Sequence, residues 1–201
     1  MINIKICGIK SIQDAQVAID AGADALGFVF AKGKNHINPE KAREICNTLP
    51  PFIATTGVFM DEERHVVQEI SSFCNLDILQ FHGIEAPEYC RKFTQRVIKA
   101  FSIEKEINYE LINKYDSVSG VLLDGSQPGK AKKFNWDLIE KARLAKPLII
   151  AGGINSDNID ELIERVRPYA IDVSSGATAD GAKSYEKIKA IVDSARRTYY
   201  E

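Results

Sequence analysis

The sequence of 201 residues has few of the features that mark several protein classes. Its four cysteines, Cys7, Cys46, Cys74 and Cys90, include no Cys-x-x-Cys pair, so neither a zinc knuckle nor a disulfide framework is indicated. No apolar run approaches the ~20 residues that cross a bilayer, and the first residues lack the charged and apolar regions of a signal peptide. We therefore expect a cytoplasmic protein with reduced thiols and no membrane partner.

The chain also lacks an excess of charge of one sign. Its 26 Lys and Arg residues face 28 Asp and Glu residues, which gives a formal net charge of −2. Proteins that bind nucleic acid normally carry a basic excess or stripe, so no nucleic-acid partner is expected. Hydrophobic residues make up 45% of the sequence, and a chain of this length suits one domain with its own core. We expect a single domain over residues 1–201.

Short β-rich apolar runs alternate with segments of helical spacing along the whole chain. The runs begin near Asn3, Ala25, Ile53, Asp77, Val97, Ser119, Pro147 and Ala170. Helices are predicted after the N-caps Ser11 and Asn38, with Pro39 at a first helical position, and over about residues 62–72, 87–94, 105–113, 136–145, 156–166 and 184–197.

Eight strand–helix units predict parallel pairing of the strands. The closed solution is the (β/α)₈ or TIM barrel, whose usual size of ~250 residues makes this chain close to the minimum. An open doubly wound sheet is the alternative architecture. No glycine-rich dinucleotide fingerprint follows the first strand, which weakens that alternative.

Functional groups collect at the predicted carboxyl ends of the strands, where the chemistry of this barrel is located. The first, fourth and sixth strands end at Cys7, His82 and Asp124, and small-residue turns follow the seventh and eighth strands. Backbone N–H groups without bulky side chains can cradle a phosphate, although such glycines can also serve tight turns alone. The sequence predicts a phosphorylated small-molecule substrate bound by Gly152, Gly153, Ser174, Ser175 and Gly176.

Seven segments, in chain order, resemble the phosphoribosylanthranilate isomerase family: residues 5–9 (KICGI), 22–30 (GADALGFVF), 57–59 (GVF), 79–83 (LQFHG), 122–124 (LLD), 151–154 (AGGI) and 171–176 (IDVSSG). The resemblance implies a TIM barrel of tryptophan biosynthesis, an aromatic amino acid pathway, with no metal or organic cofactor. The implied reaction is an Amadori rearrangement that turns N-(5-phosphoribosyl)anthranilate into the 1-deoxyribulose 5-phosphate aminoketose. It also implies that Cys7 is the general base and Asp124 the general acid.

Acid–base chemistry of this kind requires a proton donor and a proton acceptor on either side of the sugar. A free thiol titrates near ~8.5 and a free aspartate near ~3.9, so we expect the pKa of Cys7 to fall and that of Asp124 to rise. Strand alternation places Lys5 on the same inward face as Cys7, and a nearby ammonium favours thiolate. Because an unpaired ammonium inside a barrel is costly, we expect Asp172, inward like Ser174, to pair with Lys5.

The loop after the second strand departs from the family pattern. Asn35 stands where the family carries the arginine of a Ser-x-Arg-x-Ile motif, which is associated with the anthranilate carboxylate. Asparagine cannot form a charge-assisted fork with a carboxylate; Lys32, Lys34 or His36 could supply the charge. Two alternatives stay open: an isomerase of a different N-(phosphoribosyl)amine, or a catalytically weak phosphosugar-binding paralogue.

Two further loops depart as well. After the sixth strand, the family's Gly-Gly-x-Gly-Lys stretch is reduced to one glycine and Lys130, and residues 177–183 lack the usual charged residue. Retention of both the thiol and the carboxylate argues against a protein that only binds. We expect a monomer or homodimer whose substrate pocket is lined by Lys5, Asn35, His36, Gln80, His82 and Lys130.

Overall fold

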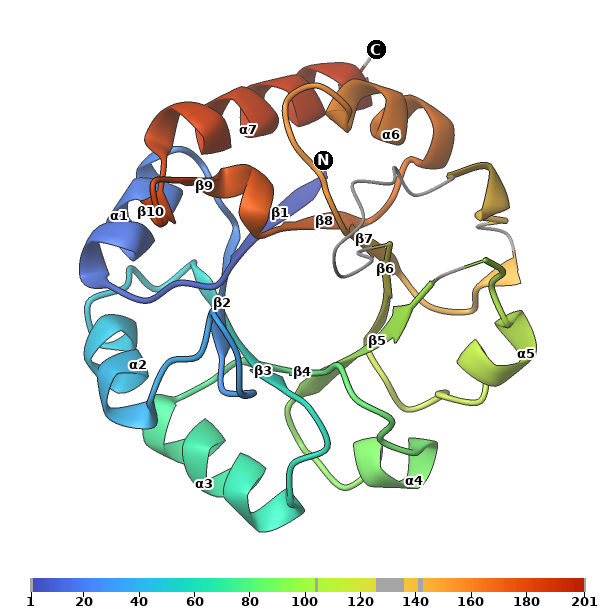
Figure 1. The fold of residues 1–201 in the computed structure, drawn as a ribbon. Helices are drawn as coiled ribbons and strands as arrows, with labels where there is room; N and C mark the ends of the chain where they lie inside the picture. The colour runs from blue at the N-terminus through green and yellow to red at the C-terminus, as the bar shows by residue number, and fades with distance from the viewer. Residues whose placement is uncertain (1, 104, 126–135, 141–142, 201) are drawn as a thin grey trace.

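The computed structural model describes residues 2–103, 105–125, 136–140 and 143–200. Eight parallel strands close into a barrel in chain order, and the last strand pairs with the first. Figure 1 shows the strands as an inner ring that the helices surround. The strands are β1 (Asn3–Cys7), β2 (Ala25–Val29), β3 (Ala54–Phe59), β4 (Ile78–Phe81), β5 (Arg96–Ser102), β6 (Gly120–Asp124), β7 (Leu148–Ala151) and β8 (Ala170–Val173). The predicted TIM barrel is confirmed.

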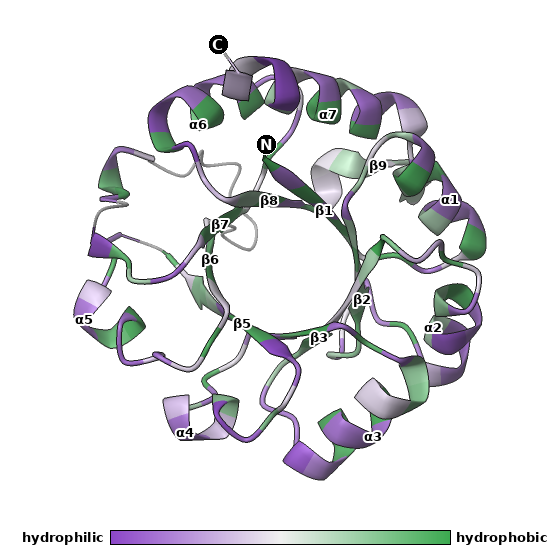
Figure 2. Cartoon of the chain, turned by 180° about the vertical axis from the view of Figure 1, so that it is seen from behind, coloured by the Kyte–Doolittle hydropathy of each residue, from purple (hydrophilic) through white to green (hydrophobic). Residues whose placement is uncertain are grey.

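The α-helices of the described chain lie outside the barrel, and their apolar sides face the strands (Figure 2). Ser11 caps the first helix by accepting a hydrogen bond from the Asp14 N–H (3.0 Å), and Asn38 caps the second in the same way. No helix in the described segments is both long and apolar enough to span a bilayer. The helices are α1 (Ile12–Asp20), α2 (Pro39–Cys46), α3 (Arg64–Cys74), α4 (Pro87–Cys90), α5 (Tyr109–Ile112), α6 (Ile159–Val166) and α7 (Tyr185–Tyr200).

The α-helix predicted over residues 136–145 is wrong where the structure describes it: a 3₁₀ turn, η1 (Trp136–Leu138), forms at its start, and none of the described residues of the segment is in an α-helix. The Tyr109 hydroxyl from α5 explains the interruption. It donates to the Leu138 carbonyl oxygen (3.0 Å) and accepts from the Glu140 N–H (2.6 Å). Backbone groups that an α-helix would pair internally are thus bonded to a side chain.

The apolar residues form two separate cores. A large one fills the space between the strands and the helices. A small one lies inside the barrel and consists of Ile98, Ala100, Leu122, Ile149, Ala151 and Ala170. Because this inner core blocks the barrel, the polar strand ends surround a closed-bottomed depression rather than a channel.

The chain after β8 folds back over the end of β1. A 3₁₀ turn, η3 (Ser175–Ala177), leads into an antiparallel hairpin of β9 (Thr178–Ala179) and β10 (Ala182–Lys183). From β10 the Lys183 ammonium donates to the carbonyl oxygens of Cys7 (2.7 Å) and Ser174 (3.1 Å). This lysine therefore joins the ends of β1 and β8, two strand ends that carry predicted site residues.

Candidate active site

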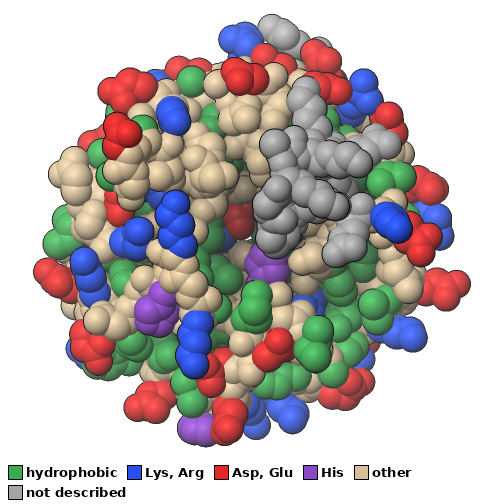
Figure 3. Space-filling view, in the orientation of Figure 1, with side chains coloured by type: hydrophobic (Ala, Val, Ile, Leu, Met, Phe, Trp, Pro, Cys, Tyr) green, Lys and Arg blue, Asp and Glu red, His purple; other side chains and the backbone are tan. Residues whose placement is uncertain are grey.

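A pocket of about 350 Å³ opens at the carboxyl ends of the strands. Figure 3 shows it as the hollow at the centre of this face, with a histidine side chain at its edge. Most of the residues predicted from the sequence line it together: Cys7, Asn35, Gln80, His82, Asp124, Gly152, Gly153, Ser174 and Ser175. Residues from six of the eight strands, or from the loops that follow them, thus converge on one cavity.

Three predicted residues that the structure describes are not part of this lining. Lys5 is buried directly beside the Cys7 thiol, and Gly176 lines an adjacent hollow that shares Gly153 with the main pocket. His36 is not part of the lining, because its exposed ring turns toward the Phe30 carbonyl oxygen, 3.1 Å from Nδ1. Lys130 lies outside the described residues.

The expected Lys5–Asp172 pair is confirmed. The Lys5 Nζ lies 2.8 Å from Asp172 Oδ2, and both side chains are less than 10% exposed. The two residues are opposite each other in the β1–β8 register, so strand alternation turns both into the barrel. The Lys5 ammonium also interacts with the Cys7 thiol, which places a cation, an anion and a thiol in one buried cluster.

Glycine at position 27 makes room for this cluster. A Cβ there would lie 2.8 Å from the Cys7 Sγ and 3.0 Å from the Lys5 Nζ. Both atoms therefore pack directly against the backbone of β2, and a side chain at position 27 would displace them.

The predicted fall in the Cys7 pKa is wrong for this structure. Burial, the largest effect, raises the pKa of the thiol, because the thiolate loses its hydration; Lys5 lowers it less, and Asp172 adds to the rise. Lys183 also favours the thiolate, more weakly than Lys5. The surroundings of Cys7 in the free protein therefore favour the neutral thiol over the thiolate, although Lys5 and Lys183 act in the opposite direction.

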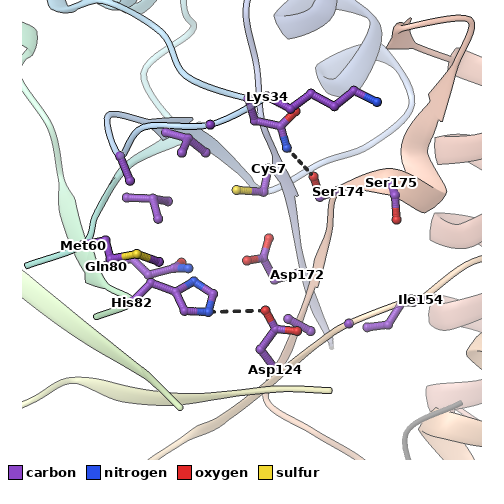
Figure 4. A pocket seen from close by; sticks show the side chains of 18 of the residues that line it. Cys7, Lys34, Met60, Gln80, His82, Asp124, Ile154, Asp172, Ser174 and Ser175 are labelled. Atoms are coloured by element: carbon purple, nitrogen blue, oxygen red, sulfur yellow. Dashed lines mark hydrogen bonds and ion pairs between the residues drawn. The ribbon is translucent and has the colours of Figure 1, made fainter. Parts of the chain in front are cut away.

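Asp124 faces Cys7 from the other side of the pocket, with Asp172 between them in the view of Figure 4. Its carboxylate lies 3.3 Å from the His82 Nε2, and both side chains are partly buried. Asp124 ends β6 and His82 follows β4, so the contact spans the strand that lies between them, β5.

The small-residue turns after β7 and β8 form another wall of the pocket, in addition to the sides that carry Cys7 and Asp124. Gly152 and Gly153 have φ values of 100° and 67°, a conformation that favours glycine. A Cβ on Gly176 would lie 1.9 Å from the Ile154 carbonyl oxygen, so only glycine lets the two loops approach this closely. The two turns therefore bring backbone with small side chains to the pocket, the kind of surface that an anion site requires.

Two buried acceptor atoms in the pocket have no hydrogen-bond partner within the described chain: Asp172 Oδ1 and Gln80 Oε1. Buried polar atoms are rarely left unpaired, because desolvation without a hydrogen bond is costly. Both residues line the cavity. A ligand that brings hydroxyl or N–H donors between β4 and β8 would satisfy both atoms.

Asn35 lies at the edge of the pocket, and its Nδ2 is 3.4 Å from the Ser174 hydroxyl oxygen. Lys32 and Lys34 from the same loop also line the cavity and supply positive charge there. In Figure 4 the Lys34 side chain points away from Cys7, over Ser174 and Ser175.

Sequence reasoning missed Lys183, which contacts the Cys7 carbonyl oxygen and lies in a strand of only two residues. So short a strand gives no periodic signal, and the lysine reaches the site only through the fold-back after β8. As to metals, the described residues contain no group of three or more His, Cys, Asp or Glu side chains arranged to hold an ion.

Comparison with known proteins gives a consistent result. Residues 4–194 match the family model described as N-(5'phosphoribosyl)anthranilate (PRA) isomerase. An N-(5'-phosphoribosyl)anthranilate isomerase of Moorella thermoacetica is 46% identical over 202 residues, which cover 98% of this chain and 91% of that protein.

Solved structures agree. A phosphoribosyl anthranilate isomerase in complex with reduced 1-(o-carboxyphenylamino)-1-deoxyribulose 5-phosphate has a TM-score of 0.86 and 38% identity, covering 98% of this chain and 100% of the other. Monomers generated from the dimeric enzyme of Thermotoga maritima give a TM-score of 0.86 at 36% identity, with the same coverage. The chain belongs to the N-(5'-phosphoribosyl)anthranilate isomerase family.

Proposed function

We propose that Cys7 is the general base and Asp124 the general acid of this isomerase. The chain converts N-(5'-phosphoribosyl)anthranilate into 1-(o-carboxyphenylamino)-1-deoxyribulose 5-phosphate in tryptophan biosynthesis. The observation that carries the assignment is the placement of a thiol and a carboxyl group on opposite walls of one pocket, next to glycine turns suited to phosphate.

The first step opens the sugar ring. Asp124 donates a proton to the ribose ring oxygen, the bond between C1' and that oxygen breaks, and the nitrogen lone pair forms a C1'=N iminium. His82 supports this step because its Nε2 lies within reach of the Asp124 carboxylate and holds it in place. A positioned acid of this kind contributes about 10²–10⁴ to the rate.

The second step moves the double bond. Cys7 acts in the fraction of the protein in which the thiol has already lost its proton to solvent: the thiolate removes the C2' proton, giving an enolamine that tautomerises to the ketone. Formation of the iminium places positive charge near the thiol, and Lys5 adds a fixed one. Both charges favour the thiolate, so proton transfer becomes easier at the stage of the reaction that needs it.

The remaining walls fit the rest of the substrate. The phosphate is bound by backbone N–H groups of the turns at Gly152–Gly153 and Ser174–Gly176. Ribose hydroxyls donate to the unpaired oxygens of Asp172 and Gln80. Lys32 supplies positive charge on the side that receives the anthranilate carboxylate.

The direct test is an activity assay with freshly prepared N-(5'-phosphoribosyl)anthranilate. Turnover is followed as loss of the fluorescence of the anthranilate derivative. Conversion at an enzyme-like rate supports the proposal, whereas turnover of other phosphoribosylamines without turnover of this one would contradict it.

Replacing Asn35 with arginine tests the carboxylate end of the pocket. An arginine can form a paired, charge-assisted contact with a carboxylate, and one hydrogen bond to a charged group contributes about 1.5–3 kcal/mol. We therefore expect KM for the anthranilate substrate to fall about tenfold, as measured by the fluorescence assay. Asn35→Gln, which adds length without charge, is the control and should leave KM unchanged. A higher KM for Asn35→Arg would favour a different amine as substrate.

The pH profile tests the Cys7 environment. As a base, Cys7 acts when deprotonated, so kcat/KM should rise with pH toward the raised thiol pKa. Lys5 lowers that pKa and Asp172 raises it. Lys5→Met should therefore move the rising limb to higher pH, and Asp172→Asn should move it to lower pH. Each pKa unit changes the thiolate fraction at pH 7 about tenfold. Shifts of the same sign in both variants would contradict the assignment.

We further infer that the chain is a monomer or a homodimer. The molar mass of the purified protein, measured by light scattering, distinguishes the two states.

A further inference from the structure

A second buried ion pair lies under the loop between β4 and α4, on the outer side of the barrel wall, and neither partner takes part in the chemistry above. The Lys99 Nζ of β5 is 3.2 Å from the Glu85 Oε2, and both side chains are only 2% exposed. The desolvation penalty of two buried charges roughly offsets their attraction, so such a pair is weak evidence of a stabilising role. Its position relative to the active site offers a more specific explanation.

The pair holds both backbone groups of Gly83. The Lys99 ammonium donates to the Gly83 carbonyl oxygen at 2.7 Å, and the Gly83 N–H donates to the Glu85 Oε2 at 3.0 Å. Lys99 also donates to the Ala100 carbonyl oxygen at 2.9 Å, which fixes the ammonium to its own strand. The peptide groups on both sides of Gly83 are thus anchored to β5 by charged groups.

Asp61, which follows β3, also holds the loop between β4 and α4 in place. The Asp61 N–H donates to the Glu85 Oε1 (2.9 Å), and the Asp61 Oδ1 accepts from the Ile84 N–H (2.7 Å). Asp61 has a φ of 51°, in the left-handed region, which aspartate adopts more readily than most residues other than glycine. A Cβ on Gly83 would come within 2.3 Å of the Asp61 Oδ1, so the loop has little freedom to move.

The residue before Gly83 is His82. Its own N–H donates to the Phe59 carbonyl oxygen at 2.9 Å, and its ring reaches Asp124 at 3.3 Å. The His82 ring is therefore attached to a short backbone segment that is fixed on both sides. Before the ring, the His82 N–H is bonded to Phe59; after it, Gly83 is held by the charges of Lys99 and Glu85.

We propose that Lys99 and Glu85 are positioning residues for the reaction: by holding Gly83 they aim the His82 ring at the carboxyl group of Asp124. This inference deepens the proposed function and rests on the role assigned to Asp124. Removal of either charge leaves the pocket lining intact but lets His82 turn away from the general acid. The chemical step then slows, while substrate binding at the phosphate turns is retained.

The test is a double-mutant cycle between the ion pair and the histidine. His82→Ala should lower kcat about tenfold to a hundredfold, the loss expected when a hydrogen bond to a charged group is removed, with little change in KM. Glu85→Gln keeps the size of the side chain and removes its charge. It should lower kcat about tenfold in the parent protein but less than about twofold in the His82→Ala background. The same fold reduction of kcat by Glu85→Gln in the parent protein and in the His82→Ala background would overturn the proposal.

Tyr115→Phe is the matched control. The Tyr115 hydroxyl donates to the backbone oxygen of Glu85 at 2.9 Å, so this variant perturbs the same residue without touching its carboxylate. It should keep the kcat of the parent protein. The ¹⁵N resonances of the His82 ring give an independent readout: they should shift in Glu85→Gln and stay unchanged in Tyr115→Phe. Unchanged resonances in Glu85→Gln would overturn the proposal even if kcat fell.

The outcome separates this inference from the proposed function. Full activity of an Asp124→Asn variant would show that Asp124 is not the general acid. The group toward which His82 is proposed to be aimed would then have no role in the reaction. Suppose instead that Asp124→Asn loses activity and that Glu85→Gln lowers kcat equally with and without His82. The assignment of Asp124 as general acid would then stand, and only the positioning role of Lys99 and Glu85 would be overturned.

Discussion

Replacing Cys7 with alanine should lower kcat by about 10²–10⁴, the contribution of a positioned acid or base. The C2' proton then has no thiolate to accept it at the end of β1. The phosphate turns and the Asp124–His82 contact do not involve this side chain, so KM should change little. The fluorescence assay gives kcat and KM, and circular dichroism shows whether the variant is folded.

The control for this prediction is Cys74→Ala. Cys74 is also a buried free thiol, but it lies on α3 outside the pocket. It should retain the kcat of the parent protein. Cys7→Ser adds a finer comparison, since its hydroxyl has nearly the size of the thiol but is a far weaker acid; we expect it to be slow as well. Near-parent activity of Cys7→Ala would exclude Cys7 as the base.

The barrel and the composition of the pocket could be predicted from the sequence because both follow from simple periodicities. Regular alternation of strand and helix closes into eight parallel strands. The two-residue repeat within each strand predicts which side chains point inward. Lys5 and Asp172 illustrate the reach of this rule: far apart in sequence, they form a 2.8 Å ion pair because β1 and β8 are neighbours and both residues point inward.

The direction of the Cys7 pKa could not be predicted in the same way. The sequence indicates that an ammonium is near the thiol, which lowers the pKa. It does not give the depth of burial, and burial raises the pKa by more. The two effects compete, and their balance depends on the hairpin and on the loops that cover the strand end, not on β1 alone.

Loop contacts account for most of what sequence reasoning missed. Lys183 reaches Cys7 by a fold-back of the chain, and Lys99 and Glu85 meet beneath a loop between β4 and α4. Neither contact has a fixed spacing in the sequence. The failed helix after residue 136 has the same origin, since the hydroxyl of Tyr109 takes up backbone groups that local spacing assigns to the helix.

Replacing Asp124 with asparagine should also lower kcat by about 10²–10⁴. The amide has the size of the carboxyl group and can still contact His82, but it cannot give up a proton to the ribose ring oxygen. Ring opening therefore becomes slow, while binding of the phosphosugar is kept. Steady-state kinetics by the fluorescence assay measure the loss, and calorimetry with a reduced, non-reacting product analogue measures the binding.

Asp116→Asn provides the control for this change, because Asp116 is an exposed carboxylate that pairs with Arg91 on the surface at 2.9 Å. The same chemical substitution there should leave kcat unchanged. Binding of the analogue to Asp124→Asn within a few-fold of the parent protein, together with the loss of kcat, assigns the carboxyl group to the chemical step. A parallel loss of binding and turnover would instead assign Asp124 to substrate binding, and the general acid would have to be sought elsewhere in the pocket.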